Sequence, residues 1–344
     1  MLPPLPKKLY AVGFSARKRP FLRNLLPESH IQFSHSLRKI PDGSTVVVWG
    51  QQIPAQPENI TIIRVEDGFL RSVGLGADLI RPLSWVIDRR GIYYDATQPS
   101  DLEHLLEYAD FPQELLERAQ QLQQLIVEKG LSKYNIGTTS ALNFPDKQKK
   151  ILVIGQVESD ASIKKGGCGI KTNFDLIKEV RTANPNAYII YKPHPDIEAG
   201  LRSKGVNEQL IDHYCENIIH NTSIIQLFDY VDEVHVITSL TGFEALLRNK
   251  IVYCYGHPFY AGWGLTKDAL PTSRRTRRLS VLELVAATLI LYPRYVSPQT
   301  NQLISVEDAI HTLLQQSKTN TTTPFWRYLF RPILRLLAEM QGRA

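Results

Sequence analysis

Two carboxylates, Glu158 and Asp160, directly follow an apolar run of the kind that forms a buried strand. The run, Ile151 to Ile154, is rich in β-branched residues and ends abruptly at Gly155. In open α/β sheets, ligands bind just beyond the carboxyl ends of such strands. The two acids are therefore either carboxylates of an active site or ordinary surface carboxylates of a solvated loop.

Three more loops in this half of the chain follow predicted strands and carry polar side chains. In Lys192-Pro-His-Pro195, a proline on each side of His194 fixes the direction of the imidazole, which favours a donor to a phosphate over a buried or capping histidine. Thr238-Ser-Leu-Thr-Gly242 precedes a predicted helix and offers hydroxyls and backbone N–H groups to an anion, although serine and threonine there also serve as helix caps. The last loop runs from His257 to Gly264.

These loops together predict a nucleotide phosphate site with Asp160 facing it. A carboxylate in that position suits a nucleophile or a base at a glycosyl centre. Glu244, one turn into the predicted helix, can accept hydrogen bonds from ribose hydroxyls or simply complement the helix dipole. In the first half of the chain, Glu66, Asp67 and Arg71 end a strand that should face the same cleft. Arg71 can pair with a substrate carboxylate or phosphate, or internally with one of these two acids.

The elements that must position these loops alternate between strands and helices. A helix is predicted from residue 113 to about residue 129, because its apolar residues recur at helical spacing and Gly130 ends the pattern. Ser100 is a plausible cap of the preceding helix. The order predicts an α/β protein with two Rossmann-like units, whose parallel sheets face a central cleft. The predicted strands are residues 9–12, 44–50, 59–65, 85–88, 151–154, 187–191, 233–238 and 251–255.

A polar segment with a lysine-rich end, residues 135–150, is the best linker candidate. We therefore predict an N-terminal, acceptor-side unit over residues 1–145 and a donor-binding unit with closing helices over residues 146–317. Residues 318–344 form a polar spacer and a basic amphipathic tail. The tail is either a helix packed on the body or an interfacial anchor on an anionic membrane.

The composition is that of an ordinary globular protein, with 344 residues, 43% hydrophobic and 22% charged. The formal charge is +6, but apart from residues 274–278 and the C-terminus the basic residues are scattered, and no nucleic-acid motif occurs. An anionic small substrate or an anionic membrane accounts for this charge equally well. We expect no nucleic-acid partner.

The three cysteines are widely spaced, contain no CxxC pair and indicate neither a disulfide framework nor a zinc site. We expect a protein of the reducing cytoplasm. The N-terminus lacks the order of a secretory signal, and no apolar run approaches the length of a membrane span. Neither export by a signal peptide nor a transmembrane helix is expected.

Several long loop motifs, in the same order and over about residues 47–298, resemble the bacterial capsule-synthesis family of KpsC type. Members of that family are retaining β-Kdo glycosyltransferases that usually carry two modules in tandem. This sequence contains one module, which is more similar to the second because of its Gln-Val-Glu-x-Asp loop. The motifs are Glu66-Asp-Gly-Phe-Leu-Arg-Ser72, Pro82-Leu-Ser84, Asp88-Arg-Arg-Gly-Ile-Tyr-Tyr-Asp95, Gln156-Val-Glu-Ser-Asp-Ala-Ser162, Tyr191-Lys-Pro-His-Pro-Asp196, Thr238-Ser-Leu-Thr-Gly-Phe-Glu-Ala-Leu-Leu247 and Tyr255-Gly-His-Pro-Phe-Tyr-Ala-Gly-Trp-Gly-Leu-Thr266.

The resemblance implies a GT-B-like pair of domains, CMP-β-Kdo as the donor, and no metal or other cofactor. It implies that Asp160 is the nucleophile that forms a Kdo adduct, with Glu158 and His194 in the catalytic group. Glu66, Asp67 and Arg71 are assigned to acceptor handling or to support of the site. The nucleotide site is assigned to Lys192, His194, Pro195, Thr238, Ser239, Thr241, Gly242 and Glu244.

The expected acceptor is a glycolipid or a Kdo-terminated glycan of capsule or lipopolysaccharide synthesis. We expect a cytoplasmic protein in peripheral contact with the anionic inner membrane, which other capsule-assembly proteins can join. Two alternatives stay open. One is transfer of another CMP-linked nonulosonic acid, such as a sialic acid, and the other is a non-catalytic glycolipid-binding module for capsule export.

Overall fold

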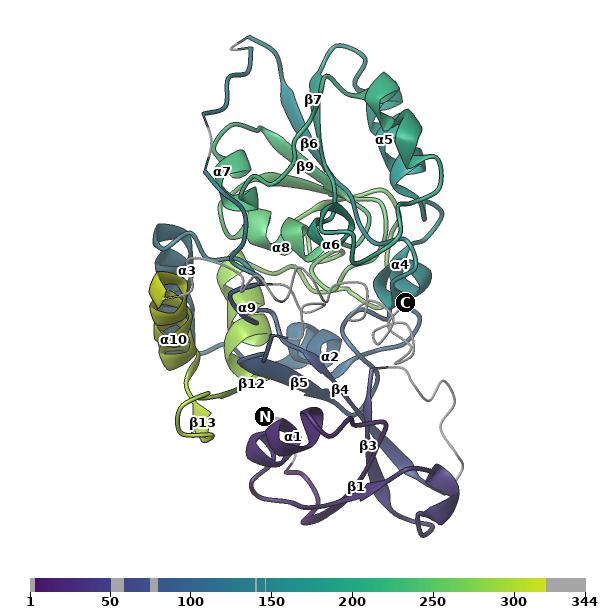
Figure 1. Cartoon of the computed structure of the whole chain (residues 1–344), viewed down its shortest axis with the longest axis vertical. Coiled ribbons are helices and arrows are strands. Elements are labelled where there is room, and N and C mark those ends of the chain that lie inside the picture. The colour runs from purple at the N-terminus through teal and green to yellow at the C-terminus, as the bar shows by residue number, and fades with distance from the viewer. Residues whose placement is uncertain (1–3, 51–58, 75–79, 140, 146, 320–344) are drawn as a thin grey trace.

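The protein folds into two α/β units, one above the other in Figure 1, each built around its own sheet. The computed structural model describes residues 4–50, 59–74, 80–139, 141–145 and 147–319. The predicted basic tail, residues 325–344, lies outside the described residues. Two Rossmann-like sheets in one chain confirm the predicted GT-B-like α/β class.

The first sheet has seven strands in the described part of the chain, in the order β13-β12-β5-β4-β3-β1-β2. Its parallel half comprises β1 (Lys8–Val12), β2 (His30–Ser34), β3 (Thr45–Trp49) and β4 (Thr61–Asp67). The other three strands are antiparallel: β5 (Ser84–Asp88), β12 (Pro293–Val296) and β13 (Leu303–Ile304). This sheet is therefore mixed, which differs from the all-parallel sheet expected from the sequence.

The second sheet is parallel throughout its described strands, in the order β11-β10-β9-β6-β7-β8. Its central strand β6 (Lys150–Ile154) alternates side chains between two apolar cores, with Leu152 and Ile154 on one face and Ile151 and Val153 on the other. Burial on both faces explains why this strand reads as a continuous apolar run. The other strands are β7 (Tyr188–Lys192), β8 (Asn217–Ile218), β9 (Glu233–Val236), β10 (Ile251–Cys254) and β11 (Lys267–Asp268).

The helix boundaries agree with the sequence prediction where the sequence contains a capping or helix-ending residue. Ser100 accepts a hydrogen bond from the backbone of Glu103, and α3 ends at Glu128, just before Gly130. The α-helices are α1 (Lys18–Leu25), α2 (Asp101–Tyr108), α3 (Gln113–Glu128), α4 (Ala161–Gly166), α5 (Asn173–Ala183), α6 (Pro195–Glu198), α7 (Ile224–Phe228), α8 (Leu240–Leu246), α9 (Val281–Val285) and α10 (Val306–Thr319). Three further turns are the 3₁₀ helices Leu37–Lys39 and Glu208–Tyr214 and the π-helix Ala286–Leu291.

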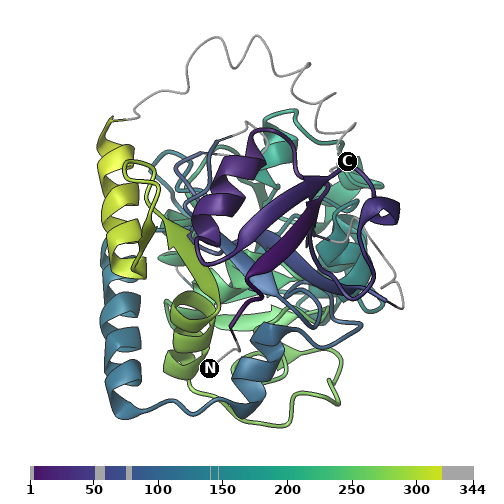
Figure 2. The same ribbon diagram turned by 90° about the horizontal axis from the view of Figure 1, so that it is seen from below.

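The end of the described chain returns to the first unit. Strand β12 hydrogen-bonds to β5, and the start of α10 contacts α3 through a two-fold hydrogen-bonded ion pair between Glu307 and Arg118 (Figures 1 and 2). The predicted division at residues 145 and 146 placed these segments in the second unit. Strand pairing across a distance of some 200 residues has no local sequence signal, so the return was not predictable from the pattern.

One apolar core spans both units. It includes Phe69 from the end of β4, and Phe243 and Phe259 from the second unit, with 4.8 Å between the ring centroids of Phe69 and Phe259. Side chains of β6 and α9 enter the same core. The junction of the two units is therefore held by continuous apolar packing. No helix among the described residues is long and apolar enough to cross a bilayer.

Candidate active site

Asp160 lies where β6 has ended and α4 begins. It occupies the N-cap position of α4 in an extended backbone conformation, yet its carboxylate makes no capping hydrogen bond. Its ion partner is Arg202, whose guanidinium lies 3.6 Å away, too far for a hydrogen bond. The side chain is 42% exposed. The carboxylate is thus positioned by the helix start but free to meet a ligand.

The titratable groups around Asp160 lie in the second unit and in the segment between α3 and β6. Burial raises the pKa of the Asp160 carboxyl above its usual range, while Arg202, His194 and Lys133 oppose this effect and Asp196 adds to it. Lys133 belongs to the segment that joins the units, and the other three belong to the second unit. The site is therefore at the junction between the two sheets.

Glu158 has both carboxylate oxygens occupied by backbone N–H groups. One oxygen accepts from Asn173, the first residue of α5, at 2.8 Å, and the other accepts from Val206 at 2.9 Å. A side chain added at Gly205 would collide with this carboxylate, at 2.2 Å. Glu158 therefore anchors the loop that carries Arg202 to the start of α5.

His194 is the N-cap residue of α6, so it has the capping role that the sequence analysis ranked below that of a phosphate donor. Its Nδ1 accepts a hydrogen bond from the N–H of Asp196 at 3.1 Å, which assigns the proton of the neutral ring to Nε2. Pro195 forms the first residue of α6. The Nε2–H group has no partner among the described residues and can donate to an anion.

Lys192 lies behind the site in a buried ion pair. Its ammonium contacts Glu198 at 2.7 Å, and both side chains are 9% exposed. The second oxygen of Glu198 accepts from His220 and from the N–H of Asn221. This network holds α6 against β7, and the predicted direct contact of Lys192 with the nucleotide stays a prediction.

The loop from Thr238 to Gly242 is fixed by close contacts. Gln156 donates to the Thr238 hydroxyl and accepts from its N–H, at 3.1 and 2.8 Å. Ser239 caps α8 by accepting from the N–H of Thr241. A side chain on Gly242 would come within 2.2 Å of the hydroxyl of Tyr260, so glycine is needed there. The capping interpretation of Ser239 is confirmed, and the Thr241 hydroxyl has no described partner.

Glu244 is buried on α8 and reaches across the junction. Its Oε1 accepts from the backbone N–H of Lys133 at 2.7 Å. Burial raises the pKa of the Glu244 carboxyl, and the hydrogen bond, Arg248 and Lys133 oppose the rise. Glu244 thus holds the connecting segment, and its predicted contact with ribose stays a prediction.

Arg71 and Asp67 form the internal pair that the sequence left open. Arg71 Nε lies 2.7 Å from Asp67 Oδ2, and Arg71 is 3% exposed. Asp67 Oδ1 accepts from the indole of Trp85, so both of its oxygens are engaged. Glu66 accepts from the N–H of Asp67. These residues support the wall of the site from the first unit.

Four residues at the junction were missed by the sequence analysis: Lys133, Tyr134, Asp196 and Arg202. None stands in a motif that indicates chemistry by itself. Asp196 was visible as the end of the Lys-Pro-His-Pro-Asp loop, but Arg202 and Lys133 lie in segments without a pattern.

Among the described residues, no three His, Cys, Asp or Glu side chains are placed to hold a metal ion.

The basic run at residues 274–278 is largely used inside the protein. Arg274 and Arg275 both bind the carboxylate of Glu103 on α2, and Arg277 binds Glu283. Arg275 also donates to the carbonyls of Pro258 and Ala261. The run therefore ties the loop after His257 to the first unit.

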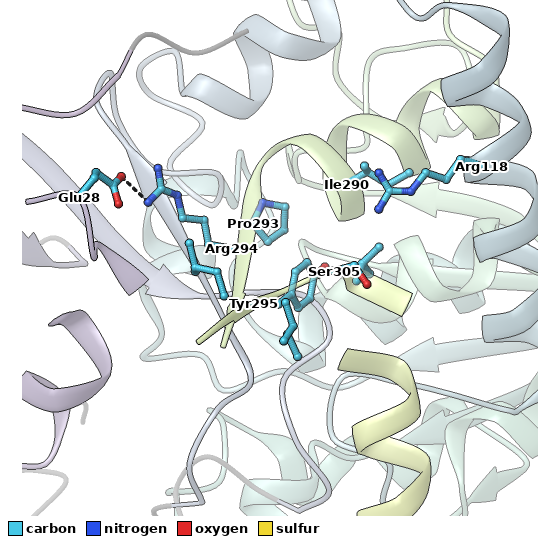
Figure 3. Close-up of a pocket in the computed structure, with 10 residues that line it drawn as sticks. Glu28, Arg118, Ile290, Pro293, Arg294, Tyr295 and Ser305 are labelled. Atoms are coloured by element: carbon cyan, nitrogen blue, oxygen red, sulfur yellow. Dashed lines mark hydrogen bonds and ion pairs between the residues drawn. The ribbon is translucent and has the colours of Figure 1, made fainter. Parts of the chain in front are cut away.

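A pocket of about 450 Å³ lies apart from these residues, between β12, β13 and α3 (Figure 3). Its two arginines are already paired, Arg294 with Glu28 and Arg118 with Glu307. None of the predicted site residues lines it. The pocket is not part of the candidate active site.

Comparison with known proteins identifies the family. Residues 46–295 match the family model described as "Capsule polysaccharide biosynthesis protein". The capsule polysaccharide modification protein LipA of Neisseria meningitidis serogroup A is 44% identical over 323 residues, covering 90% of this chain and 46% of LipA. The lipopolysaccharide-processing protein LpsZ of Rhizobium meliloti is 45% identical over 259 residues, covering 74% of this chain and 59% of LpsZ. The chain thus spans about half the length of these relatives.

Two solved structures from Thermosulfurimonas dismutans share the fold. The structure described as KpsC, beta Kdo 2,7 transferase, has a TM-score of 0.76 and 41% identity, covering 90% of this chain and 99% of that chain. The KpsC beta Kdo 2,4 transferase has a TM-score of 0.78 and 34% identity, covering 88% of this chain and 97% of that chain. By sequence and fold, this chain belongs to the capsule polysaccharide biosynthesis protein family and is of the KpsC type.

Proposed function

We propose that this protein is a retaining glycosyltransferase that moves Kdo from CMP-β-Kdo to a glycolipid or Kdo-terminated acceptor. The pathway is capsular polysaccharide or lipopolysaccharide synthesis. Family membership and the likeness to two Kdo transferases support the reaction class. The observation that carries the mechanism is the Asp160 carboxylate, which makes no capping hydrogen bond to α4. It lies in the loop after β6, with Arg202 3.6 Å away and His194 among the groups that act on its pKa.

Donor binding follows from the groups around Asp160. The Nε2–H of His194 donates to the CMP phosphate, and Arg202 contributes a positive charge on the same side. Thr241 and Ser239, at the start of α8, bind the nucleotide. Glu158 acts at a distance, because its two backbone hydrogen bonds position the loop that carries Arg202.

Transfer then proceeds by two displacements at the anomeric carbon. The Asp160 carboxylate forms a bond to this carbon while the bond to the CMP phosphate oxygen breaks, and CMP leaves as an anion stabilised by His194 and Arg202. An acceptor hydroxyl next attacks the same carbon, gives its proton to solvent and releases the Asp160 carboxylate. Each displacement inverts the centre, so two of them retain the configuration.

Mass spectrometry of the protein after incubation with CMP-Kdo tests this mechanism. We expect wild type to yield a peptide that contains Asp160 and carries one Kdo. Asp160→Ala should form no adduct and lose transfer activity by roughly 10³-fold or more. The product linkage, determined by NMR on a Kdo-terminated synthetic lipid, should be β.

Binding of CMP provides the control. Because CMP lacks the sugar, Asp160→Ala should bind it about as well as wild type. Transfer that is unaffected by Asp160→Ala would contradict the proposed nucleophile. Absence of transfer from CMP-Kdo by wild type on any Kdo-terminated acceptor would contradict the proposed function.

The proposal also covers the location of the protein in the cell and its contact with the membrane. We place the protein in the cytoplasm, in peripheral contact with the inner membrane through the basic tail. Deleting residues 325–344 should release it from anionic liposomes and leave activity on a soluble acceptor in place. Equal liposome binding by the truncated and full-length proteins counts against the anchor.

A further inference from the structure

The backbone of Lys133 is held by both units at their junction. Its N–H donates to the Glu244 carboxylate on α8 at 2.7 Å. Its carbonyl accepts from the N–H groups of Arg71 and Ser72, at 3.4 and 3.3 Å. The backbone position from which the Lys133 side chain extends is thus fixed by α8 and by the first unit.

The ammonium of Lys133 has no hydrogen bond and no ion pair with any residue that the structure describes. Its Nζ lies 5.3 Å from the centroid of the Tyr134 ring, and the side chain is half-buried. Burial alone lowers the pKa of Lys133, but Tyr134, Tyr93 and Asp67 together raise it above its ordinary value. A charged, partly desolvated ammonium without a counter-ion is a place for an anion.

The other cations near Asp160 have partners or a different role. Arg71 is paired with Asp67 and Lys192 is paired with Glu198. Arg202 forms an ion pair with Asp160 at 3.6 Å, and the proposed function assigns it to the CMP phosphate. Lys133 is left without a described partner. Its N–H is bonded to Glu244 of α8, and the loop before α8 is bonded to Gln156, which lies in the same loop as Asp160.

A second unsatisfied group lies nearby. The buried Oδ1 of Asp196 has no hydrogen-bond partner among the described residues. Asp196 and Lys133 both act on the hydroxyl of Tyr134 and on the carboxylate of Asp160. One place therefore offers an unpaired cation and an unpaired acceptor, which suits a ligand with both a negative charge and hydroxyl groups.

We propose that Lys133 binds the carboxylate of the transferred sugar while Asp160 attacks the adjacent anomeric carbon, an inference that rests on the proposed function. In a ulosonic acid such as Kdo, the carboxylate is attached directly to the anomeric carbon. A cation beside the nucleophile therefore meets this carboxylate and selects acidic sugars over neutral ones. The Oδ1 of Asp196 accepts a hydrogen bond from a hydroxyl of the same sugar.

Two donors and two variants test this assignment. CMP-Kdo is compared with its C1-carboxamide form, in wild type and in Lys133→Met, which keeps the apolar stem and removes the charge. Wild type should lose about 10- to 100-fold in kcat/KM on the carboxamide, and Lys133→Met should lose a similar factor on CMP-Kdo. Lys133→Met should then hardly distinguish the two donors, because the losses come from one interaction.

Controls separate this role from a structural one. The dissociation constant for CMP and the melting temperature should be the same in Lys133→Met as in wild type, and Lys133→Arg should restore the preference for CMP-Kdo. Lys165→Met, which removes an exposed lysine of α4, should leave both donors unaffected. If Lys133→Met does not fold, Lys133→Gln replaces it in the same comparison.

The failures are distinguishable. If wild type is active but Lys133→Met keeps the full preference for CMP-Kdo over the carboxamide, the assignment is overturned and the proposed function stands. The same holds if wild type uses both donors equally. If wild type transfers nothing from CMP-Kdo, the proposed function is overturned and the role of Lys133 with it.

Discussion

The Glu244 carboxylate on α8 accepts a hydrogen bond from the backbone N–H of Lys133, at 2.7 Å. The residues are separated by 111 positions, and the bond connects the donor-side helix to the segment between the units. Helix α8 begins at the Thr238–Gly242 loop, so one short element touches both the predicted nucleotide site and the position of Lys133. The predicted nucleotide site and the connection between the units therefore share α8.

Glu244→Ala should weaken this connection. It leaves the N–H of Lys133 without its acceptor, which costs on the order of 1–3 kcal/mol in the free energy of unfolding if no water replaces it. We also expect a higher KM for the donor, because Lys133 is less well placed. Urea denaturation and steady-state kinetics measure the two effects.

Glu244→Gln is the matched control for that substitution. The amide oxygen can still accept from Lys133, and the burial of a charge is removed, so stability and KM should stay close to wild type. If the alanine and glutamine variants behave alike, the hydrogen bond is not the cause.

Arg202→Met should change the pH dependence of the reaction. Burial raises the pKa of Asp160, and Arg202 is the largest of the effects that lower it. Removing the guanidinium raises the pKa further, so the carboxylate is protonated at a higher pH. The acid limb of the plot of kcat/KM against pH should therefore move to higher pH.

Lys204→Met provides a comparison in the same loop. Lys204 is exposed and does not appear among the charges that act most on Asp160. Its removal should leave the acid limb in place. An acid limb that Arg202→Met does not move would argue that another group titrates there.

Glu158→Ala should act through structure more than through chemistry. It removes the acceptor of two backbone N–H groups, at Asn173 and Val206, and so frees the loop that carries Arg202. We expect a loss of stability on the order of 1–3 kcal/mol and a fall in kcat that is much smaller than that of Asp160→Ala.

Adduct formation separates the two acids. Glu158→Ala should still accumulate the Kdo adduct on Asp160, only more slowly, whereas Asp160→Ala should not. Complete loss of the adduct in a folded Glu158→Ala protein would assign Glu158 a direct role in the chemistry.

Asp88 should make the stability of the protein depend on pH. Burial, and next the nearby carboxylate of Asp101, raise the pKa of Asp88 to about 6. Between pH 4 and 6 the native state holds a proton that the unfolded state has lost, so the free energy of unfolding falls as the pH rises through this window. Two pKa units correspond to on the order of 3 kcal/mol.

Asp88→Asn isolates this effect. Asn keeps one acceptor oxygen and puts an NH2 group in place of the other. Either the N–H groups of Arg90 and Gly91 or the N–H of Asp101 and the hydroxyl of Tyr292 therefore lose their acceptor, so the variant should be less stable than wild type at pH 4. The difference from wild type should shrink as the pH rises to 7, because only wild type titrates at this position. A difference that is constant with pH would show that Asp88 does not titrate in this range.

The sequence by itself determined the local parts of this protein. Strand β6 was predictable because four apolar residues ending at Gly155 suit a strand buried on both faces. The caps at Ser100 and Ser239 were predictable because each side chain acts on the backbone two or three residues away. The carboxylates after β6 and the histidine after β7 were also visible, since the ends of parallel strands meet at one edge of a sheet.

Only the tertiary structure decided how these parts meet. Arg71 forms an ion pair with Asp67, Lys192 forms one with Glu198, and Glu158 accepts hydrogen bonds from two backbone N–H groups. The Asp160 carboxylate, in contrast, makes no capping hydrogen bond. The same residue types could have served either purpose, because the choice depends on distances between segments far apart in the chain.

The return of β12 to β5 and the position of Lys133 have the same origin. No local pattern marks either of them, since the free energy that places them comes from strand pairing and apolar packing across both units. Sequence patterns therefore predicted which loops carry chemistry, and long-range packing determined which side chains remain free to perform it.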